Sequence, residues 1–136
     1  MYIIVVGCGR LGSHLANTLS RQGHSLVVID RDKEAFSALS IDFSGFQLEG
    51  DAIELAVLRQ AKTDRADLVI ASTSEDNVNL MVAQVAKTVF KVPRVLARVF
   101  DPKRERIYGE LGIETVSPVA LAADHILGLL AGGAGK

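Results

Sequence analysis

A glycine-rich turn between an expected strand and an expected helix constrains this chain more than any other feature. The motif is Gly-Cys-Gly-Arg-Leu-Gly, at residues 7–12. Residues 2–6 are apolar and mostly β-branched, and this run is too short for a helix, so it predicts a buried strand. Leu11, Leu15, Ala16 and Leu19 then recur on one face of a predicted helix. A G-x-G-x-x-G motif in this context is typical of a dinucleotide-binding fold.

Each glycine of the motif has a steric role in such a fold. Gly7 permits the tight turn, Gly9 leaves room for a pyrophosphate, and Gly12 lets the helix lie close to the strand. Free N–H groups at the helix start face the anion. A cation in the first helical turn opposes the helix dipole, so we expect Arg10 to bind a phosphate rather than only water. The predicted cofactor-binding segment comprises Gly7, Cys8, Gly9, Arg10, Leu11 and Gly12.

Apolar strands alternate with helices along the rest of the chain. Further strands are expected at residues 25–30, 43–48, 66–71, 94–99 and 113–116. Helices are expected from about Leu11 to Gly23 and at residues 32–40, 51–61, 72–91, 101–111 and 117–131. Near-continuous apolar strands indicate a parallel sheet covered on both faces. The sequence therefore predicts an α/β, Rossmann-type doubly wound sheet of six parallel strands, with residues 1–131 as one nucleotide-binding domain and residues 132–136 as a flexible tail.

Ligands of such sheets bind at the carboxyl ends of the strands. Asp30 ends the second expected strand 18 residues after Gly12, which is close to the spacing of about 20 residues for the acid that binds ribose hydroxyls. A simple helix cap is the alternative role for Asp30. Its carboxylate disfavours the 2′-phosphate of NADP, whereas the neighbouring Arg31 is able to pair with such a phosphate.

Other strand ends supply further candidates for ligand contacts. Asp51 with Glu54, and Ser72 with Glu75, also satisfy the spacing of a helix capping box, which would explain them without a ligand. Arg98 either reaches a phosphate or points outward. The predicted cofactor-binding residues outside the glycine motif are Asp30, Arg31, Gly50, Asp51, Ala52, Ser72, Thr73, Asn77 and Arg98.

Composition excludes several classes of partner and site. The chain carries 15 basic and 16 acidic residues in an interspersed pattern, and it therefore lacks the basic patch that is typical of nucleic-acid-binding proteins. Three scattered histidines and Cys8 have no metal-ligand spacing, so no metal is expected. Cys8 lies near a helix N-terminus and is expected to have a somewhat acidified thiol. No signal-peptide pattern precedes the first strand, so a cytoplasmic location is expected.

The last expected helix is apolar around most of its circumference. Such a helix needs burial on more than one side. Packing on the sheet is expected to use one face, and the remainder predicts a partner surface, most simply a symmetric homodimer. The residues of this surface are Val119, Leu121, Ala122, Ile126, Leu127, Leu129 and Leu130.

With these residues in place, the chain resembles the TrkA-N or RCK domain, the nucleotide-binding domain of potassium-transport regulators in Trk and Ktr systems and of ligand-gated potassium channels. The resemblance covers essentially the whole chain. It rests on an ordered set of motifs that is more specific than the glycine motif alone: residues 7–12 with arginine in the fourth place, Asp30, Gly50-Asp51-Ala52, and Ser74-Glu75-Asp76-Asn77 followed by Asn79-Leu80.

The resemblance implies a regulatory module rather than an enzyme. Members of the family bind NAD(H), ATP, ADP or AMP and pass the ligand state to a membrane potassium transporter through a homodimer or a larger ring. Arg10 would sense phosphates, Asp30 would hold the ribose and Asp51 would lie near the adenine. The last helix would be a C-terminal crossover helix that reaches a neighbouring subunit. Val119 stands where Ktr-type members carry an acid that helps to bind a divalent cation, so the resemblance implies no metal there.

Members of the family usually continue into a C-terminal ligand-binding subdomain, so the chain is either a stand-alone regulator or part of a longer protein. Two other functions compete with the regulatory one. An NAD-dependent oxidoreductase needs a group that handles the substrate proton, and no His or Lys stands at an expected strand end. A purely structural assembly domain with a vestigial site would bind no adenine nucleotide.

Overall fold

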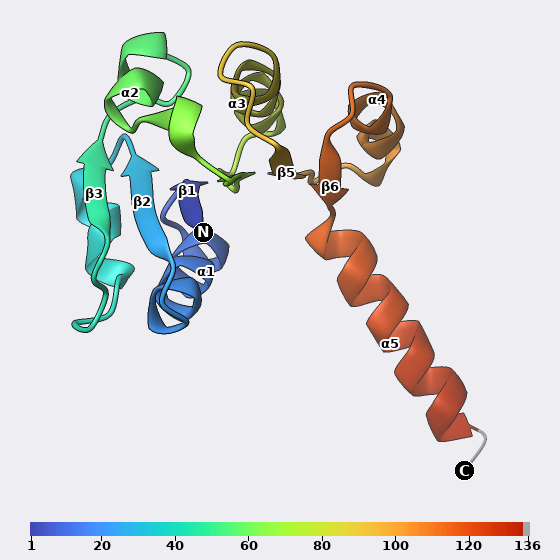
Figure 1. The fold of residues 1–136 in the computed structure, drawn as a ribbon. Coiled ribbons are helices and arrows are strands. Elements are labelled where there is room, and N and C mark those ends of the chain that lie inside the picture. Colours follow the sequence, from blue (N-terminus) through green and yellow to red (C-terminus); the bar gives the residue numbers. More distant parts are fainter. Residues whose placement is uncertain (135–136) are drawn as a thin grey trace.

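The computed structural model describes residues 1–134 and contains a six-stranded parallel sheet in the order β3-β2-β1-β4-β5-β6 (Figure 1). This is the doubly wound order of the Rossmann fold, so the predicted fold class is confirmed. The strands are β1 (Tyr2–Val6), β2 (Ser25–Asp30), β3 (Phe46–Glu49), β4 (Leu68–Ala71), β5 (Arg94–Arg98) and β6 (Glu114–Val116).

Helices alternate with the strands along the chain. The α-helices are α1 (Arg10–Arg21), α2 (Leu55–Gln60), α3 (Asp76–Thr88), α4 (Glu105–Glu110) and α5 (Pro118–Ala134), and the 3-10 helices are η1 (Lys33–Ala38), η2 (Thr63–Arg65) and η3 (Pro102–Arg104). Gly23, with φ +90°, follows the end of α1, as the sequence predicts. None of the helices in residues 1–134 has the length and apolar character needed to cross a membrane.

Alternate residues of the central strands build two apolar cores, one on each face of the sheet. Ile4 and Val6 of β1 pack with residues of α2, α3 and α4, such as Leu58, Val82 and Tyr108. Ile3 and Val5 of β1 face the other way, toward α1 and η1. Side chains of neighbouring residues in a strand point to opposite faces, so this β-branched run fills both cores at once.

Several element starts differ from the prediction: β4 begins at Leu68 rather than at residue 66, and α3 begins at Asp76 rather than at residue 72. For two others, side chains that bind backbone groups locally explain the difference. The third strand begins at Phe46 rather than at residue 43. The hydroxyl of Ser20 on α1 accepts the backbone N–H of Ser44 at 3.1 Å, so that N–H group is used before the strand starts. Asp51 and Glu54 form no capping box: Asp51 Oδ1 accepts from Ile53 N at 3.2 Å, and α2 begins one turn later, at Leu55.

The last helix differs most from the prediction. The hydroxyl of Ser117 accepts the N–H of Ala120 at 3.2 Å, so the predicted Ser-Pro start of the helix is confirmed. The helix then continues through Ala134, three residues beyond the predicted end at Ala131, since glycine lowers helix stability by only about 1 kcal/mol. Residues 135–136 of the predicted tail lie outside the described residues.

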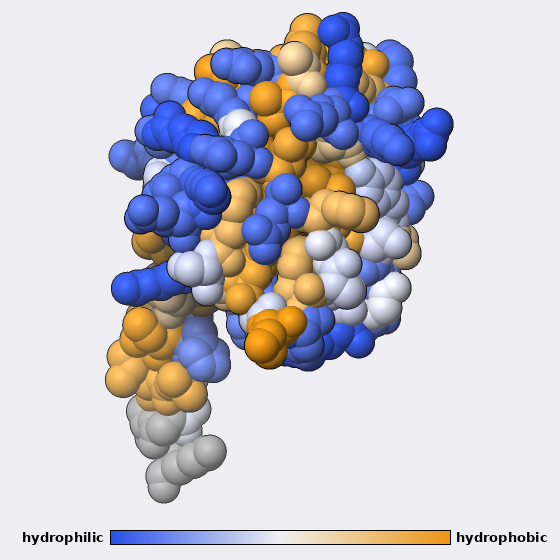
Figure 2. Space-filling model, turned by 90° about the vertical axis from the view of Figure 1, so that its left-hand side faces the viewer, coloured by the Kyte–Doolittle hydropathy of each residue, from blue (hydrophilic) through white to orange (hydrophobic). Residues whose placement is uncertain are grey.

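The prediction that α5 packs on the sheet is wrong for this chain. The helix leaves the body after β6 and projects away from the sheet (Figure 1), and residues 121–132 are all exposed. Figure 2 shows it as a largely apolar arm below the body. The short β6 ends at the edge of the sheet, and no described strand lies beyond it for α5 to cover.

Candidate functional site

A cleft of about 360 Å³ lies at the carboxyl ends of the central strands. The strand order reverses between β1 and β4, which is where doubly wound sheets bind ligands. Most of the predicted site residues are brought together here. The cleft is lined by Val6, Gly7, Gly9, Arg10, Ile29, Asp30, Arg31, Gly50, Asp51, Ala52, Ser72, Thr73, Ser74, Glu75, Val78 and Arg98.

The glycine turn has the geometry expected from its motif. Gly7 has φ +97°, and a Cβ atom there would lie 2.9 Å from Thr73 N. A Cβ atom on Gly12 would collide with the carbonyl oxygen of Gly7, whereas a Cβ atom on Gly9 would meet nothing within 4 Å. Gly7 and Gly12 are therefore needed for the fold of the turn. The open space at Gly9 belongs to the cleft.

Asp30 holds the glycine turn through its carboxylate. Oδ2 accepts the backbone N–H of Cys8 at 2.8 Å, and Oδ1 accepts the backbone N–H of Asp32, also at 2.8 Å. Each carboxylate oxygen has a further lone pair, so both can still accept from ligand hydroxyls. The side chain that would hold a ribose is thus fixed in place before any ligand binds.

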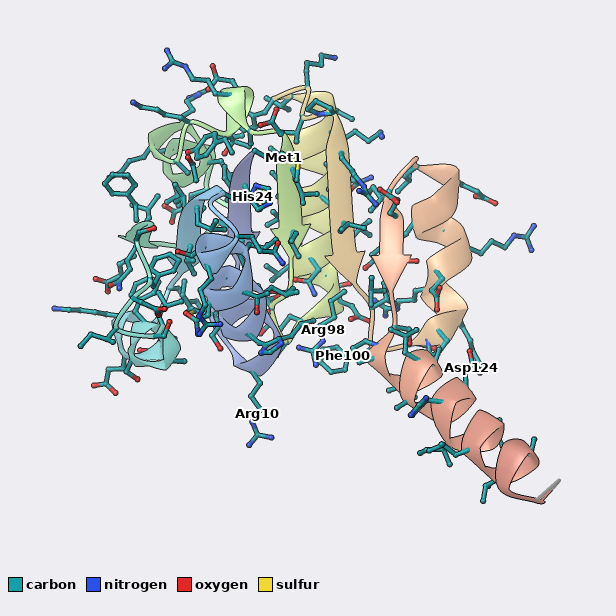
Figure 3. The ribbon with its side chains drawn as sticks, turned by 60° about the horizontal axis from the view of Figure 1, so that its bottom comes forward. Met1, Arg10, His24, Arg98, Phe100 and Asp124 are labelled. Atoms are coloured by element: carbon teal, nitrogen blue, oxygen red, sulfur yellow. The ribbon has the colours of Figure 1, made fainter. Side chains whose placement is uncertain are left out.

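Three arginines bring positive charge to the cleft. Arg10, at the start of α1, extends away from the body into solvent (Figure 3). Arg31 follows β2, and its Nη2 lies 3.6 Å from Oε1 of Glu75 at the start of α3. Arg98 ends β5, and its guanidinium carbon lies 4.3 Å from the ring centroid of Phe100, which is adjacent in Figure 3.

Arg98 carries an unpaired polar atom. Its Nε is buried and has no hydrogen-bond partner among residues 1–134. A buried donor without a partner costs about 1–3 kcal/mol, more when it belongs to a charged group. The residue also lines the cleft, so a shift of its side chain on ligand binding would let a phosphate oxygen supply the missing acceptor.

Asn79 is a site residue that the sequence reasoning missed. It is fully buried within α3 and holds the loop after β4, because its Oδ1 accepts from Thr73 N at 2.9 Å and from Thr73 Oγ1. Its Nδ2 donates to the carbonyl oxygens of Thr73 and Arg98, both at 3.0 Å. The sequence does contain a sign of this role, because Asn79 lies on the same face of the helix as Val82 and Ala83, which are also buried. A polar amide on a buried helical face indicates buried hydrogen-bond partners.

Several predicted site residues lie beside the cleft rather than in its lining. Leu11 and Gly12 belong to α1 behind the turn, and Asn77 faces away, where it accepts from Arg104 Nη1 at 3.1 Å.

Ser72 forms no capping box with Glu75, because its hydroxyl donates to Val6 O at 3.0 Å and to Gly7 O. Lining residues that were not among the predicted ones are Val6, Ile29, Ser74, Glu75 and Val78.

Cys8 contributes its backbone and not its thiol. The residue is 2% exposed, and burial raises the pKa of the thiol from 9.0 to about 11, with the Asp30 carboxylate acting in the same direction. The expectation of an acidified thiol is therefore wrong, because burial and a nearby carboxylate outweigh the helix terminus. Residues 1–134 contain no group of three or more metal-ligating side chains.

Sequence comparison gives a family match and curated relatives. A family model described as the TrkA-N domain matches residues 3–118, which include every residue that lines the cleft. The chain is similar to the Trk system potassium uptake protein TrkA of Streptomyces coelicolor, with 43% identity over 127 residues. That match covers 93% of this chain and 57% of the relative, so the chain spans little more than half the length of that protein.

Solved structures with the same fold include two of GsuK. The GsuK channel bound to NAD superposes with a TM-score of 0.81 at 26% identity, over 96% of this chain and 23% of that chain. GsuK bound to ADP superposes with a TM-score of 0.79 at 28% identity, over 95% of this chain and 33% of that chain.

Proposed function

Because the chain belongs to the TrkA-N domain family, we propose that it is a regulatory module that binds NAD(H) or an adenine nucleotide (ATP, ADP or AMP) and controls a membrane potassium transporter or channel. The observation that carries this proposal is the cleft at the glycine turn. It combines a fixed carboxylate, Asp30, with three arginines, one of which has a buried nitrogen that finds no acceptor within residues 1–134. Ribose and phosphate are the ligand groups that such a set recognises.

The residues of the cleft divide by the part of the ligand they would hold. Asp30 would accept the ribose hydroxyls, and Asp51 and Ala52 would lie on the adenine side. The open backbone at Gly9 would face the phosphates, with Arg10 and Arg98 supplying the positive charge. The NAD and ADP found in the two GsuK structures share the adenosine and phosphate groups for which these residues are suited.

Regulation requires that the ligand bind one arrangement of the assembly better than another. The surface available for assembly is α5, whose exposed apolar residues belong neither to the cores nor to the cleft lining within the described part of the chain. These residues are Val119, Leu121, Ala122, Ile126, Leu127, Leu129 and Leu130. We infer a homodimer or a larger ring through this helix, located in the cytoplasm beside a membrane partner. The apolar exposure supports this, because a single chain rarely leaves so contiguous an apolar surface in water.

The cleft lining favours a sensor over an oxidoreductase. The residues that line it within positions 1–134 include no His, Lys, Tyr or Cys. Hydride transfer to a carbonyl usually needs a group that handles the substrate proton, and the lining offers only carboxylates for this role. Two of the three carboxylates already have partners, Asp30 in the glycine turn and Glu75 in Arg31. Turnover of NADH with a panel of small carbonyl compounds would support the enzyme instead.

Calorimetric titration of nucleotide-stripped protein with NADH, NAD, ATP, ADP and AMP tests the proposal. We expect at least one of them to bind, and we expect Arg10→Ala and Arg98→Ala each to weaken binding about tenfold or more, because charged hydrogen bonds to phosphate are lost. Asp30→Asn, which keeps an acceptor for the turn, should also weaken binding.

Arg106→Ala is the control, because the Arg106 side chain is 89% exposed on α4 and lies outside the cleft. If none of the nucleotides bound, the proposal of a nucleotide sensor would be overturned. That result would leave an assembly domain as the remaining function.

A further inference from the structure

We propose that Glu75 sets the ligand choice of the cleft against 2′-phosphorylated nucleotides by holding Arg31. The inference rests on the proposed function, because it concerns the ribose end of the same bound nucleotide. The side chain of Glu75 lies across the cleft from β2, and it makes no hydrogen bond that caps the helix it precedes.

The two residues come from opposite sides of the cleft. Arg31 follows directly after Asp30 at the end of β2, and Glu75 lies in the loop between β4 and α3. Arg31 Nη2 and Glu75 Oε1 are 3.6 Å apart, and both residues line the cleft. Glu75 is the only carboxylate within 4.0 Å of the Arg31 guanidinium in residues 1–134.

The Glu75 carboxylate is not used by the helix that it precedes. Glu75 is the N-cap residue of α3, but its side chain makes no capping hydrogen bond. Its backbone is held separately: Glu75 N donates to Thr73 Oγ1 at 3.3 Å, and Glu75 O accepts from Asn79 N at 3.0 Å. Removing the carboxylate charge therefore leaves the local fold intact, and the ion pair with Arg31 is the interaction that changes.

A 2′-phosphate would lie beside the Asp30 carboxylate, which binds the ribose. Asp30 is held by Cys8 N and Asp32 N, so its negative charge stays at the ribose. A phosphate monoester adds about −1.5 to −2 charge at neutral pH, and it needs a cation there. Arg31 is the adjacent cation, and Glu75 already neutralises it.

The charge balance of the whole cleft leads to the same conclusion. Its charged lining residues are three arginines (Arg10, Arg31 and Arg98) and three acids (Asp30, Asp51 and Glu75), so the lining is neutral. On the proposed function Arg10 and Arg98 would bind the 5′-phosphates, which leaves Arg31 as the remaining arginine of the lining. Replacing Glu75 with an uncharged residue makes the lining positive and frees Arg31.

The experiment measures two ligands that differ by one group. Adenosine 5′-monophosphate and adenosine 2′,5′-bisphosphate are titrated into wild type, Glu75→Gln, Arg31→Gln and the double variant. NADH and NADPH serve as a second pair. The readout is the ratio of the Kd of the 2′-phosphorylated ligand to the Kd of its unphosphorylated partner.

We expect Glu75→Gln to lower this ratio about two- to fivefold, because both side chains of the pair are more than half exposed and such pairs contribute up to about 1 kcal/mol. Binding of AMP itself should change little. Arg31→Gln should raise the ratio, and the double variant should behave like Arg31→Gln because Glu75 acts through Arg31. Glu110→Gln is the matched control, because it removes an exposed carboxylate from an ion pair of the same length, 3.6 Å, on α4. It should leave the ratio unchanged.

An unchanged ratio in Glu75→Gln would overturn the proposal, as would a double variant that keeps the full effect of Glu75→Gln. Both outcomes leave AMP binding, and with it the proposed function, in place. Failure of the wild type to bind any of the four ligands would instead overturn the proposed function, and this inference with it.

Discussion

Three glycines of the turn between β1 and α1 meet three different steric demands. Gly7 needs its positive φ, Gly12 needs the missing side chain to approach Gly7 O, and Gly9 borders open space. We therefore expect Gly12→Ala to destabilise the fold by about 3 kcal/mol, since overpacking forces the backbone to move. Gly9→Ala should keep the wild-type melting temperature while weakening nucleotide binding.

Thermal unfolding and calorimetric titration of the two variants separate these effects. Each variant is the control for the other, because both add one methyl group to the same turn. A wild-type melting temperature for Gly12→Ala would show that the turn relaxes more easily than its geometry indicates.

The buried thiol of Cys8 gives a pH dependence of known sign. Its pKa is raised from 9.0 to about 11 in the folded chain, so the folded state keeps a proton that the unfolded state loses. The stability that this contributes is complete below pH 9 and is lost as the pH rises toward 11. Denaturant unfolding between pH 8 and pH 11 should show this decline in wild type and a smaller one in Cys8→Ala. Parallel curves for the two proteins would contradict it.

The residues that line the cleft were partly predictable from the sequence. Gly7 and Asp30 follow from a motif with fixed spacing, because backbone geometry dictates both. Arg98 was identified as a candidate, but only the fold shows that the residue lines the cleft and that its buried Nε has no acceptor among residues 1–134. Glu75 and Asn79 belong to the quoted family motif but were not named as site residues, because their contacts with Arg31 and Arg98 join positions 44 and 19 residues apart in the sequence.

Among the elements, the loop between β4 and α3 depends on one buried amide. Asn79 bonds to the backbone of Thr73 and of Arg98, so Asn79→Ala would leave several buried polar groups unpaired. We expect a loss of about 2–4 kcal/mol in the free energy of unfolding. Asn77→Ala, on the exposed side of the same helix, should cost less than about 1 kcal/mol.

Chemical denaturation of the two variants measures the difference directly. Nucleotide binding by Asn79→Ala should also weaken, because Thr73 and Arg98 both line the cleft. Equal stability of the two variants would show that the buried amide does not hold the loop.

Element types were more predictable than element ends. Continuous apolar runs place the four inner strands, because burial on both faces demands them. The edge strands β3 and β6 contain no fully buried residue and carry a weaker apolar pattern. The starts of β3 and α2 were missed, since Ser20 and Asp51 bind backbone N–H groups that regular structure would otherwise use. Such bonds depend on the positions of side chains in three dimensions, which periodicity does not contain.

At the scale of the whole molecule, α5 is the element whose apolar side chains are left exposed to solvent in a single chain. Leu127 and Leu130 are 63% and 64% exposed, and the sequence predicts burial for both. We expect Leu127→Asp to weaken self-association at least about tenfold, because a charge would be buried at the helix interface. Ile41→Asp is the control, because Ile41 is fully exposed in the loop before β3, and β3 forms the edge of the sheet opposite to β6, from which α5 leaves.

Light scattering coupled to size-exclusion chromatography, over a range of concentrations, measures the association. A monomeric wild type, or dissociation caused equally by both substitutions, would contradict a role for α5. The helix shows why assembly is hard to predict: an apolar pattern indicates that a surface is buried but not which surface covers it.

The ligand cleft and the protruding helix occupy consecutive stretches of the chain. All residues that line the cleft lie between Val6 and Arg98, and α5 begins at Pro118. A single recombination event between these positions replaces the helix and whatever follows it without altering one cleft residue. Genes for such domains can therefore acquire new outputs by exchange of one segment, and the nucleotide pocket is inherited unchanged.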